Sequence, residues 1–393
     1  MLRLRPTTMA AGGAALARDE NGRVVFVDGA IPNELVDAEV YEEHVDYAKA
    51  TVVSIHEPAA GRITPPCEFV AAGCGGCGWQ HIAPDVQAEL KREIVVDALR
   101  RIGRLAHADV AVAPALPSVG YRTSLRMGVR GGRAGFRAHR SHDLVDVDAC
   151  LVAHPLLGDL VRDGRYGDAR EVTLRCGTQT GERLVLASPT ARGVEVADDV
   201  VVIGESEVKR GRTARIHEVV SGRRFAISST SFFQARTDGA EALVAAVRDS
   251  FVEEDERGTF VDAYCGVGLF AGLLGEGRKV VAIERHGPAV RDARDNLGSG
   301  VNVVRSEVAT WNPLPARVVV ADPARPGLGS KAAARLAATG ATRLVLVSCD
   351  PASLGRDVAV LTGLGYAHRG STLVDLFPHT PHVEVVTRFD RIG

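Results

Sequence analysis

The sequence predicts an α/β protein whose C-terminal part is a doubly wound parallel sheet, preceded by a small β-barrel and a mainly antiparallel central α+β domain. After Asp238, short apolar runs alternate with helical stretches, and the runs are TFVDAYC, KVVAIE, VNVV, ARVVVAD and TRLVLVSC. Such alternation is typical of a parallel sheet with helices on both faces. The 393 residues are enough for two or three domains with separate cores.

The first 57 residues contain short strand-like runs separated by glycine and proline. The runs are VVFV at 24–27, LVDAEVY at 35–41 and ATVVSI at 50–55. This pattern predicts a small antiparallel β-barrel over residues 1–57. Residues 58–83 are rich in Pro, Gly and Cys, so we expect an irregular loop with little core of its own.

A central domain is predicted over residues 84–235. It begins with a helix, because apolar residues recur at helical spacing from Pro84 to Leu105 and proline suits a first helical turn. Alternating segments such as DLVDVDACLV at 143–152 and ERLVLAS at 182–188 then favour antiparallel strands. The remaining residues, 236–393, form the predicted parallel-sheet domain.

The charge balance excludes a protein that binds nucleic acid through its total charge. Lys and Arg number 47 against 49 Asp and Glu, so a polyanion must be held by a local patch. Residues 121–140 contain six arginines and no acid, which predicts contacts with phosphates, and a solvated strand face is the alternative. Since no apolar run is long enough for a membrane span or a secretory segment, we expect a cytoplasmic protein without a membrane partner.

Cysteine usage indicates metal ligation rather than disulfides. Seven cysteines, an odd number, occur without an export signal. Cys67, Cys74 and Cys77 lie in the glycine-rich segment CEFVAAGCGGC, and Cys150 is the best candidate for a fourth ligand. Four thiolates suit either a 4Fe-4S cluster or a structural zinc ion, and reduced thiols without a metal are the remaining alternative.

The segment VDAYCGVGLF, residues 261–270, has the order expected of a nucleoside-binding turn. A strand ending in Asp262 leads to Gly266 and Gly268 and an apolar helix, and Glu284 ends the next strand. Glycines let the backbone approach a ligand, and the acid can accept hydrogen bonds from ribose hydroxyls. The third glycine of a dinucleotide fingerprint is missing. We therefore favour S-adenosylmethionine (SAM) over NAD, another nucleoside or a turn without a ligand.

Cys349 closes the apolar run RLVLVSCDP at the carboxyl edge of the predicted sheet, where open α/β folds place their ligands. Asp322 ends a neighbouring strand in ADPARPG. A thiol at that edge is a candidate nucleophile, and a buried structural cysteine is the alternative. Cys176 and Cys265 are interpreted as structural.

These motifs resemble, in order, those of the RNA uracil-5-methyltransferases that use a cysteine nucleophile, and the resemblance covers nearly the whole chain. VVFVDGAIPNELV resembles a TRAM domain, an RNA-binding module with an oligonucleotide-binding-like barrel. CEFVAAGCGGCGWQH with Cys150 resembles the 4Fe-4S loop of the iron-sulfur members. The other matching motifs are SFFQ at 231–234, DAYCGVGLF, ADPARPG, SCDPASLGRD and DLFPHTPHVE. The chain departs from the family at Ala324, where a second proline is usual, and at Leu269, where several members have a polar residue.

The resemblance implies a Rossmann-like SAM methyltransferase domain that makes 5-methyluridine in ribosomal or transfer RNA. Cys349 is implied as the nucleophile and Glu384 as the base that removes the proton from carbon 5. The positions implied to contact SAM or shape the uracil pocket are Gln234, Tyr264, Glu284 and Asp322. We expect a monomer. The alternatives are a non-catalytic RNA-binding or folding factor with an idle SAM domain, and an enzyme for a small aromatic substrate.

Several neighbours of these residues have expected supporting roles. Phe232, Phe233 and Tyr264 are candidates for stacking on a base that has left its helix, and core packing is the alternative for the two phenylalanines. A helix start or Arg356 is expected to favour the Cys349 thiolate. His379 and His382 are interpreted as hydrogen-bonding or backbone-shaping residues rather than metal ligands.

Overall fold

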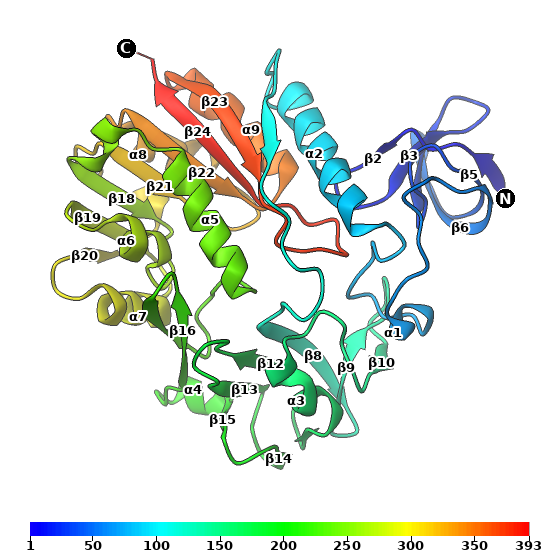
Figure 1. The fold of residues 1–393 in the computed structure, drawn as a ribbon, viewed down its shortest axis with the longest axis horizontal. Coiled ribbons are helices and arrows are strands. Elements are labelled where there is room, and N and C mark those ends of the chain that lie inside the picture. The colour runs from blue at the N-terminus through cyan, green and yellow to red at the C-terminus, as the bar shows by residue number, and fades with distance from the viewer. Residues whose placement is uncertain (393) are drawn as a thin grey trace.

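Three β-rich parts follow one another in the computed structural model, which describes residues 1–392 (Figure 1). A six-stranded sheet at the N-terminus is followed by a second six-stranded sheet and then by an eight-stranded sheet with helices. This confirms the predicted fold class. Within residues 1–392, every helix is too short or too polar to cross a membrane.

The N-terminal sheet is curled, and its strands alternate buried and exposed residues. Val25, Val27, Ala48 and Ala50 are fully buried inside it. β4 pairs with β6 in parallel, whereas the other neighbouring strands are antiparallel as predicted. In the order β1-β5-β6-β4-β3-β2, the strands have the bounds β1 (Leu2–Leu4), β5 (Leu35–Glu43), β6 (Tyr47–Glu57), β4 (Val24–Asp28), β3 (Ala15–Arg18) and β2 (Thr8–Met9).

The cysteine-rich loop, residues 58–83, is mostly irregular, as expected, and contains the short helix α1 (Glu68–Ala71). Trp79 and Ile82, near its end, are buried in the core of the N-terminal sheet. Cys74 forms an isolated antiparallel bridge with Ala138 of the central part. The loop is therefore held from both sides.

The central part is mainly antiparallel, as predicted, with one parallel pair between β13 and β15. β13 (Arg183–Ser188) confirms the strand predicted over 182–188. The strand predicted over 143–152 is shorter, because β10 (Leu144–Asp146) ends early and Cys150 lies in a following turn. The other elements are β8 (Ser124–Arg130), β9 (Arg133–Arg137), η1 (Pro155–Leu157), α3 (Gly158–Arg162), β11 (Arg165–Tyr166), β12 (Glu171–Cys176), β14 (Val194–Glu195), β15 (Val200–Gly204) and α4 (Glu205–Lys209).

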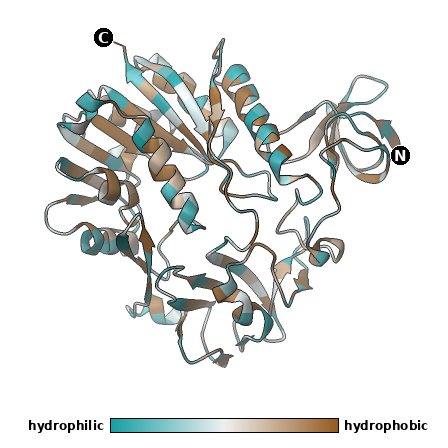
Figure 2. Cartoon of the chain, viewed as in Figure 1, coloured by the Kyte–Doolittle hydropathy of each residue, from teal (hydrophilic) through white to brown (hydrophobic). Residues whose placement is uncertain are grey.

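The C-terminal sheet has the order β20-β19-β18-β21-β22-β24-β23-β7. Its first five strands are parallel, and β24 is antiparallel to both of its neighbours. All residues of β21 and β22 are buried, which Figure 2 shows as largely apolar strands. The bounds are β20 (Asn302–Arg305), β19 (Lys279–Glu284), β18 (Thr259–Ala263), β21 (Val318–Ala321), β22 (Arg343–Ser348), β24 (Val385–Arg391), β23 (Tyr366–Leu373) and β7 (Val110–Val112).

Helices cover both faces of this sheet and form two separate cores. On one face lie α5 (Thr237–Asp249), α6 (Leu269–Leu274), α7 (Gly287–Leu297) and the hairpin of β16 (Arg215–Val220) and β17 (Arg223–Ser228). On the other face lie α2 (Pro84–Arg101), α8 (Gly329–Ala337), α9 (Pro351–Gly363) and η3 (Val308–Thr310). The remaining short element is η2 (Glu253–Glu256).

The domain boundary expected at residue 84 does not follow the packing. Val95 and Leu99 of α2 are buried in the same core as α9, and β7 pairs in parallel with β23. Figure 1 shows α2 between the N-terminal sheet and the large sheet. Helical spacing revealed that α2 has a buried face but not which part of the chain covers it.

Candidate active site

Cys349 and Glu384 lie opposite each other at the edge of the C-terminal sheet. Ser348, the last residue of β22, pairs with Val385, the first residue of β24, in an antiparallel register. The next residues along this ladder are Cys349 and Glu384. Asp322 follows β21, the parallel neighbour of β22, at the same edge. Strand register therefore brings together three of the predicted site residues.

The two carboxyl groups at this edge favour their protonated forms. Glu384 is buried, and this burial, together with the nearby charge of Asp322, raises its pKa well above the ordinary value. Burial raises the pKa of Asp322 to about 7. A buried carboxyl next to a half-buried one disfavours a second negative charge, so the pair favours keeping a proton.

The Cys349 thiol is half-buried and also favours its protonated form. Burial is the main cause that raises its pKa to about 11, the charges of Glu384 and Asp322 add to it, and Arg325 opposes it. The expected help from Arg356 is not found, because its guanidinium donates to the Ser353 hydroxyl at 2.9 Å. The cation that lowers this pKa is Arg325, which sequence spacing did not single out.

The glycine turn after β18 has a backbone conformation that favours glycine at two positions. Gly266 and Gly268 have φ angles of 55° and 94°, and a Cβ atom at Gly268 would lie 2.9 Å from the Leu297 side chain. The carboxylate of Glu284 accepts hydrogen bonds from the backbone N–H groups of Gly266 at 3.1 Å and His286 at 2.7 Å. Only glycine fits at position 268 without strain, because a side chain there would meet Leu297 and the backbone has a positive φ.

Asp262 and Tyr264 flank the start of this turn. Asp262 is fully buried, one carboxylate oxygen accepts the Ala271 N–H at 2.7 Å, and the other oxygen has no partner among residues 1–392. Its pKa is raised to about 7, by burial first and then by the charges of Asp322 and Glu284. Tyr264 is half-buried and has a φ of 65°, a conformation that non-glycine residues seldom adopt. The acidic residues of the turn and of the sheet edge thus form one electrostatic group.

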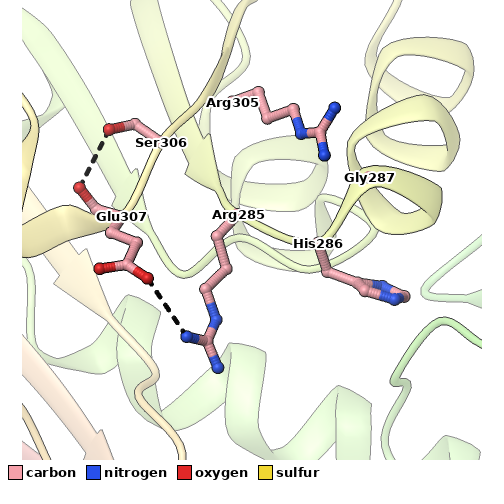
Figure 3. A pocket seen from close by; sticks show the side chains of 6 residues that line it. All are labelled: Arg285, His286, Gly287, Arg305, Ser306 and Glu307. Carbon is pink, nitrogen blue, oxygen red and sulfur yellow. Dashed lines mark hydrogen bonds and ion pairs between the residues drawn. The ribbon is translucent and has the colours of Figure 1, made fainter.

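A cavity of about 560 Å³ opens next to Glu284 (Figure 3). Arg285 and Glu307 form an ion pair at 3.4 Å on its wall. Neither residue belongs to a predicted motif, but both lie within two residues of a strand end, Arg285 after β19 and Glu307 after β20. The lining residues are Arg285, His286, Gly287, Arg305, Ser306 and Glu307.

Gln234 lies where the central sheet meets the β16–β17 hairpin. It is buried and lines a cavity of about 20 Å³ with Phe233, Arg175 and Glu218 among others. Phe232 is 68% exposed, whereas Phe233 packs against the apolar core. Of the two phenylalanines, only Phe232 is free to stack on a ligand.

The four cysteines proposed as ligands come from the cysteine-rich loop and the turn after β10. The loop is tied to β9 by a hydrogen bond from the Gly75 N–H to the Arg137 carbonyl at 3.0 Å. The thiols influence one another: charges on Cys67 and Cys150 raise the pKa of Cys74, and charges on Cys150 and Cys74 raise that of Cys77 to about 11, after the larger effect of burial. Within residues 1–392, no three His, Cys, Asp or Glu side chains are gathered closely enough to form a metal site. The structure therefore brings the thiols near one another without assembling a ligand set.

Several arginines of residues 121–140 already form ion pairs with acids from other parts of the chain. Arg126 pairs with Glu171 at 2.7 Å, Arg130 with Asp146 at 3.0 Å and Arg140 with Asp28 at 2.5 Å. The segment has no acid of its own, but other strands and the N-terminal sheet supply acids. Among the described residues, the exposed side chain of Arg133 forms one hydrogen bond, to the Arg162 carbonyl at 3.5 Å, and no ion pair. The expected basic patch is thus partly neutralised.

The chain is similar to several RNA methyltransferases. It is 36% identical to an uncharacterized RNA methyltransferase of Streptomyces coelicolor, with 96% of this chain and 90% of that protein covered, and 35% identical to one of Gloeobacter violaceus, with 98% and 95% covered. Its fold matches the Pyrococcus abyssi tRNA (uracil-54, C5)-methyltransferase in complex with S-adenosyl-L-homocysteine, with a TM-score of 0.74, 22% identity and 99% of each chain covered. No protein-family model matches. Because relatives above 30% identity span almost the full length, the chain belongs to the RNA methyltransferases.

Proposed function

We propose that the protein transfers the methyl group of SAM to carbon 5 of a uridine in RNA. The observation that carries this proposal is the register of β22 and β24, which sets the Cys349 thiol opposite the Glu384 carboxyl beside Asp322. A nucleophile and a base at the carboxyl edge of a parallel sheet suit a reaction on a ligand bound there.

Carbon 5 of uracil is a poor nucleophile, and covalent addition activates it. The Cys349 thiol releases its proton to solvent, the thiolate adds to carbon 6, and the electron pair of the carbon 5–carbon 6 double bond moves into an enolate. Carbon 5 then takes the methyl group, which leaves S-adenosylhomocysteine. Glu384, as a carboxylate, removes the proton from carbon 5, the double bond re-forms and the thiolate leaves. Each bond made is thereby balanced by one broken.

The glycine turn and its neighbours are the proposed SAM site. Gly266 and Gly268 would let the backbone approach the cofactor, and Glu284 would accept hydrogen bonds from its ribose hydroxyls. The cavity next to Glu284 supports this assignment, since it opens at the ends of β19 and β20. The other proposed contacts with SAM or uracil are Gln234, Tyr264 and Asp322.

The proposed RNA substrate is a transfer or ribosomal RNA with an accessible uridine, bound by a monomer in the cytoplasm. The likeness to a tRNA methyltransferase favours transfer RNA as the first substrate to test. The N-terminal sheet is proposed as a TRAM-like RNA-binding module. The exposed ring of Phe232 is suited to stack on a base that has left its helix.

Cys67, Cys74, Cys77 and Cys150 are proposed as ligands of a 4Fe-4S cluster, with structural zinc as the alternative. Their all-sulfur donor set and mutual electrostatic influence support this assignment. Such a group would tie the cysteine-rich loop to the central sheet, and methyl transfer from SAM needs no electrons. Iron, sulfide and zinc analysis of purified protein, together with visible absorption, separates the two metals.

An RNA that carries 5-fluorouridine tests the proposed chemistry. Carbon 5 then bears fluorine in place of the proton that the base removes, so the covalent intermediate cannot break down. The wild type should form a protein–RNA adduct that survives denaturing electrophoresis, and Cys349→Ala should form none. Cys176→Ala, at a cysteine of the central sheet, is the matched control and should form the adduct. Methylation of RNA by Cys349→Ala at the wild-type rate would contradict the proposal.

A further inference from the structure

The segment between β23 and β24, residues 374–384, is held by elements that are distant in sequence, and it ends at Glu384. Its two ends are joined by a hydrogen bond from the Val374 N–H to the Glu384 carbonyl at 2.8 Å. On the side of the central part, the Tyr121 hydroxyl donates to the Pro378 carbonyl at 3.1 Å. This segment carries the proposed base, so whatever fixes it also fixes Glu384.

His379 is held on both sides of its backbone. It has a φ of 66°, which a non-glycine residue keeps only when its surroundings impose it. Its N–H donates to the Gln87 side-chain oxygen at 2.6 Å, and its carbonyl accepts the Trp79 N–H at 2.9 Å. Both backbone polar groups of His379 are therefore engaged, one by α2 and one by the cysteine-rich loop.

Gln87 is fully buried on α2 and connects these two contacts. Its amide oxygen accepts from His379, and its amide nitrogen donates to the carbonyls of Trp79 at 3.2 Å and Ile82 at 2.7 Å. One side chain thus bridges the end of the cysteine-rich loop and the segment that carries Glu384. A hydrocarbon in its place would leave three buried backbone groups without this partner.

Lys91, one helical turn further along α2, is also fully buried and holds the same segment. Its ammonium donates to the Asp375 carboxylate at 2.6 Å and to the Phe377 carbonyl at 3.0 Å. It also lies 5.9 Å from the centre of the Trp79 ring. The two α2 residues therefore hold the segment at its start and at its middle.

We propose that Gln87 and Lys91 are positioning residues that hold residues 374–384 so that Glu384 faces Cys349, and that Gln87 couples this segment to the cysteine-rich loop through Trp79. This inference rests on the proposed function. Neither residue is placed in contact with RNA or SAM. Both act through the backbone of the segment that ends at the base.

A displaced Glu384 would slow the removal of the proton from carbon 5 more than the other steps. Addition of Cys349 and methyl transfer come before proton removal from carbon 5, so they do not need the base in that role. When proton removal slows, the methylated uridine stays bonded to Cys349. A positioning defect therefore predicts an adduct with ordinary RNA, whereas a general folding defect lowers every step together.

The test uses Gln87→Met in the full chain, with unmodified transfer RNA and SAM. We expect kcat to fall about 10- to 100-fold, the Kd for SAM to stay within about twofold, and a denaturant-resistant adduct to accumulate. Tyr121→Phe, which removes one hydrogen bond to the segment and keeps the ring, should give a smaller change of the same kind. Arg92→Met, at the next residue of α2 after Lys91 and outside this contact, is the matched control and should behave as the wild type.

Hydrogen exchange gives a readout that does not depend on activity. In Gln87→Met, the amides of Trp79 and of residues 374–384 should exchange faster together, and in Arg92→Met they should not. If Gln87→Met loses turnover without adduct, or if exchange rises in only one of the two segments, the inference is wrong. If the wild type itself forms no adduct with 5-fluorouridine RNA, the proposed function fails instead.

Discussion

The edge of the C-terminal sheet and the cysteine-rich loop each gather reactive side chains, but in different ways. At the sheet edge, Cys349, Glu384 and Asp322 follow or precede strands whose pairing sets their positions. Three thiols of the cysteine-rich loop lie near that of Cys150 in the central part, and the loop is joined to the central part by backbone hydrogen bonds and the isolated bridge of Cys74 with Ala138. At the sheet edge, strand pairing sets the positions of the side chains, whereas the thiols of the loop region lie near one another without forming a ligand set within residues 1–392.

This difference follows from the packing on each side. Every residue of β22 is buried between helices, so the strand end has little freedom. The four cysteines are half-buried, and α1 has no buried residue. Reactive groups that must act at fixed distances are better placed on strands, and groups that close around a ligand tolerate a loop.

Glu384→Gln should give the largest effect on the sheet-edge side of this comparison. The amide keeps the shape of the side chain but cannot take the proton from carbon 5, so we expect turnover to fall about 10²- to 10⁴-fold. With ordinary RNA and SAM, the adduct should accumulate. Normal turnover in this variant, measured by release of methylated RNA, would show that the base lies elsewhere.

Cys77→Ser tests the loop side. If four thiols hold a metal group, the variant should lose it and its thermal unfolding midpoint should fall, because metal binding energy contributes to folding. The Kd for SAM should change less than about twofold, since the cavity proposed for SAM is lined by residues 285–287 and 305–307 and by no residue of the loop. Cys176→Ala is the control and should keep the metal. An unchanged metal content in Cys77→Ser would mean that the loop does not bind metal.

The pH dependence of adduct formation tests the protonation state of the Cys349 thiol at the sheet edge. The pKa of Cys349 is raised to about 11, so the thiolate fraction should grow about tenfold for each pH unit between pH 7 and 9. Arg325→Met removes the cation that opposes this rise and should slow adduct formation up to about tenfold at a given pH. Arg356→Met, whose guanidinium bonds Ser353, is the matched control. Equal slowing in both variants would contradict the assignment to Arg325.

The smallest effect is expected at the central sheet, next to the cysteine-rich loop. Arg133→Gln should weaken RNA binding a few-fold and reduce the slope of log affinity against log salt concentration by about 1. Arg130→Gln should change binding less, because Arg130 already pairs with Asp146. Filter-binding titrations at several salt concentrations measure both. A larger effect at Arg130 than at Arg133 would contradict the view that an arginine already paired with an acid contributes less to RNA binding.

The parallel strands were the most predictable part of the molecule. The run KVVAIE coincides with β19, and TRLVLVSC contains β22, because strands buried on both faces are continuous apolar runs bounded by polar turns. Cys349 and Asp322 could be placed at the sheet edge for the same reason. The family resemblance was needed for Glu384, because the antiparallel insertion of β24 beside β22 is not visible in local sequence.

Contacts between distant segments were the least predictable. The segment 84–112 was assigned to a central domain, but α2 and β7 pack with the last strands of the chain. The arginine-rich stretch looked free of acids because Glu171, Asp146 and Asp28 lie outside it. The local sequence showed that α2 has an apolar face and that residues 121–140 are positively charged. The residues that cover the face and pair with the charges are known only from the fold.

The pairing of β7 with β23 also has a consequence for synthesis of the chain. Val110 pairs with Ser371, so the partner of β7 leaves the ribosome about 260 residues after it. At about 5–20 residues per second, this strand waits roughly 13 to 50 s for its neighbour. The N-terminal sheet can close early, but the connection that fastens it to the catalytic half is completed only near the end of translation. A nascent chain stalled before residue 366 would therefore carry an unmatched strand open to chaperones or to aggregation.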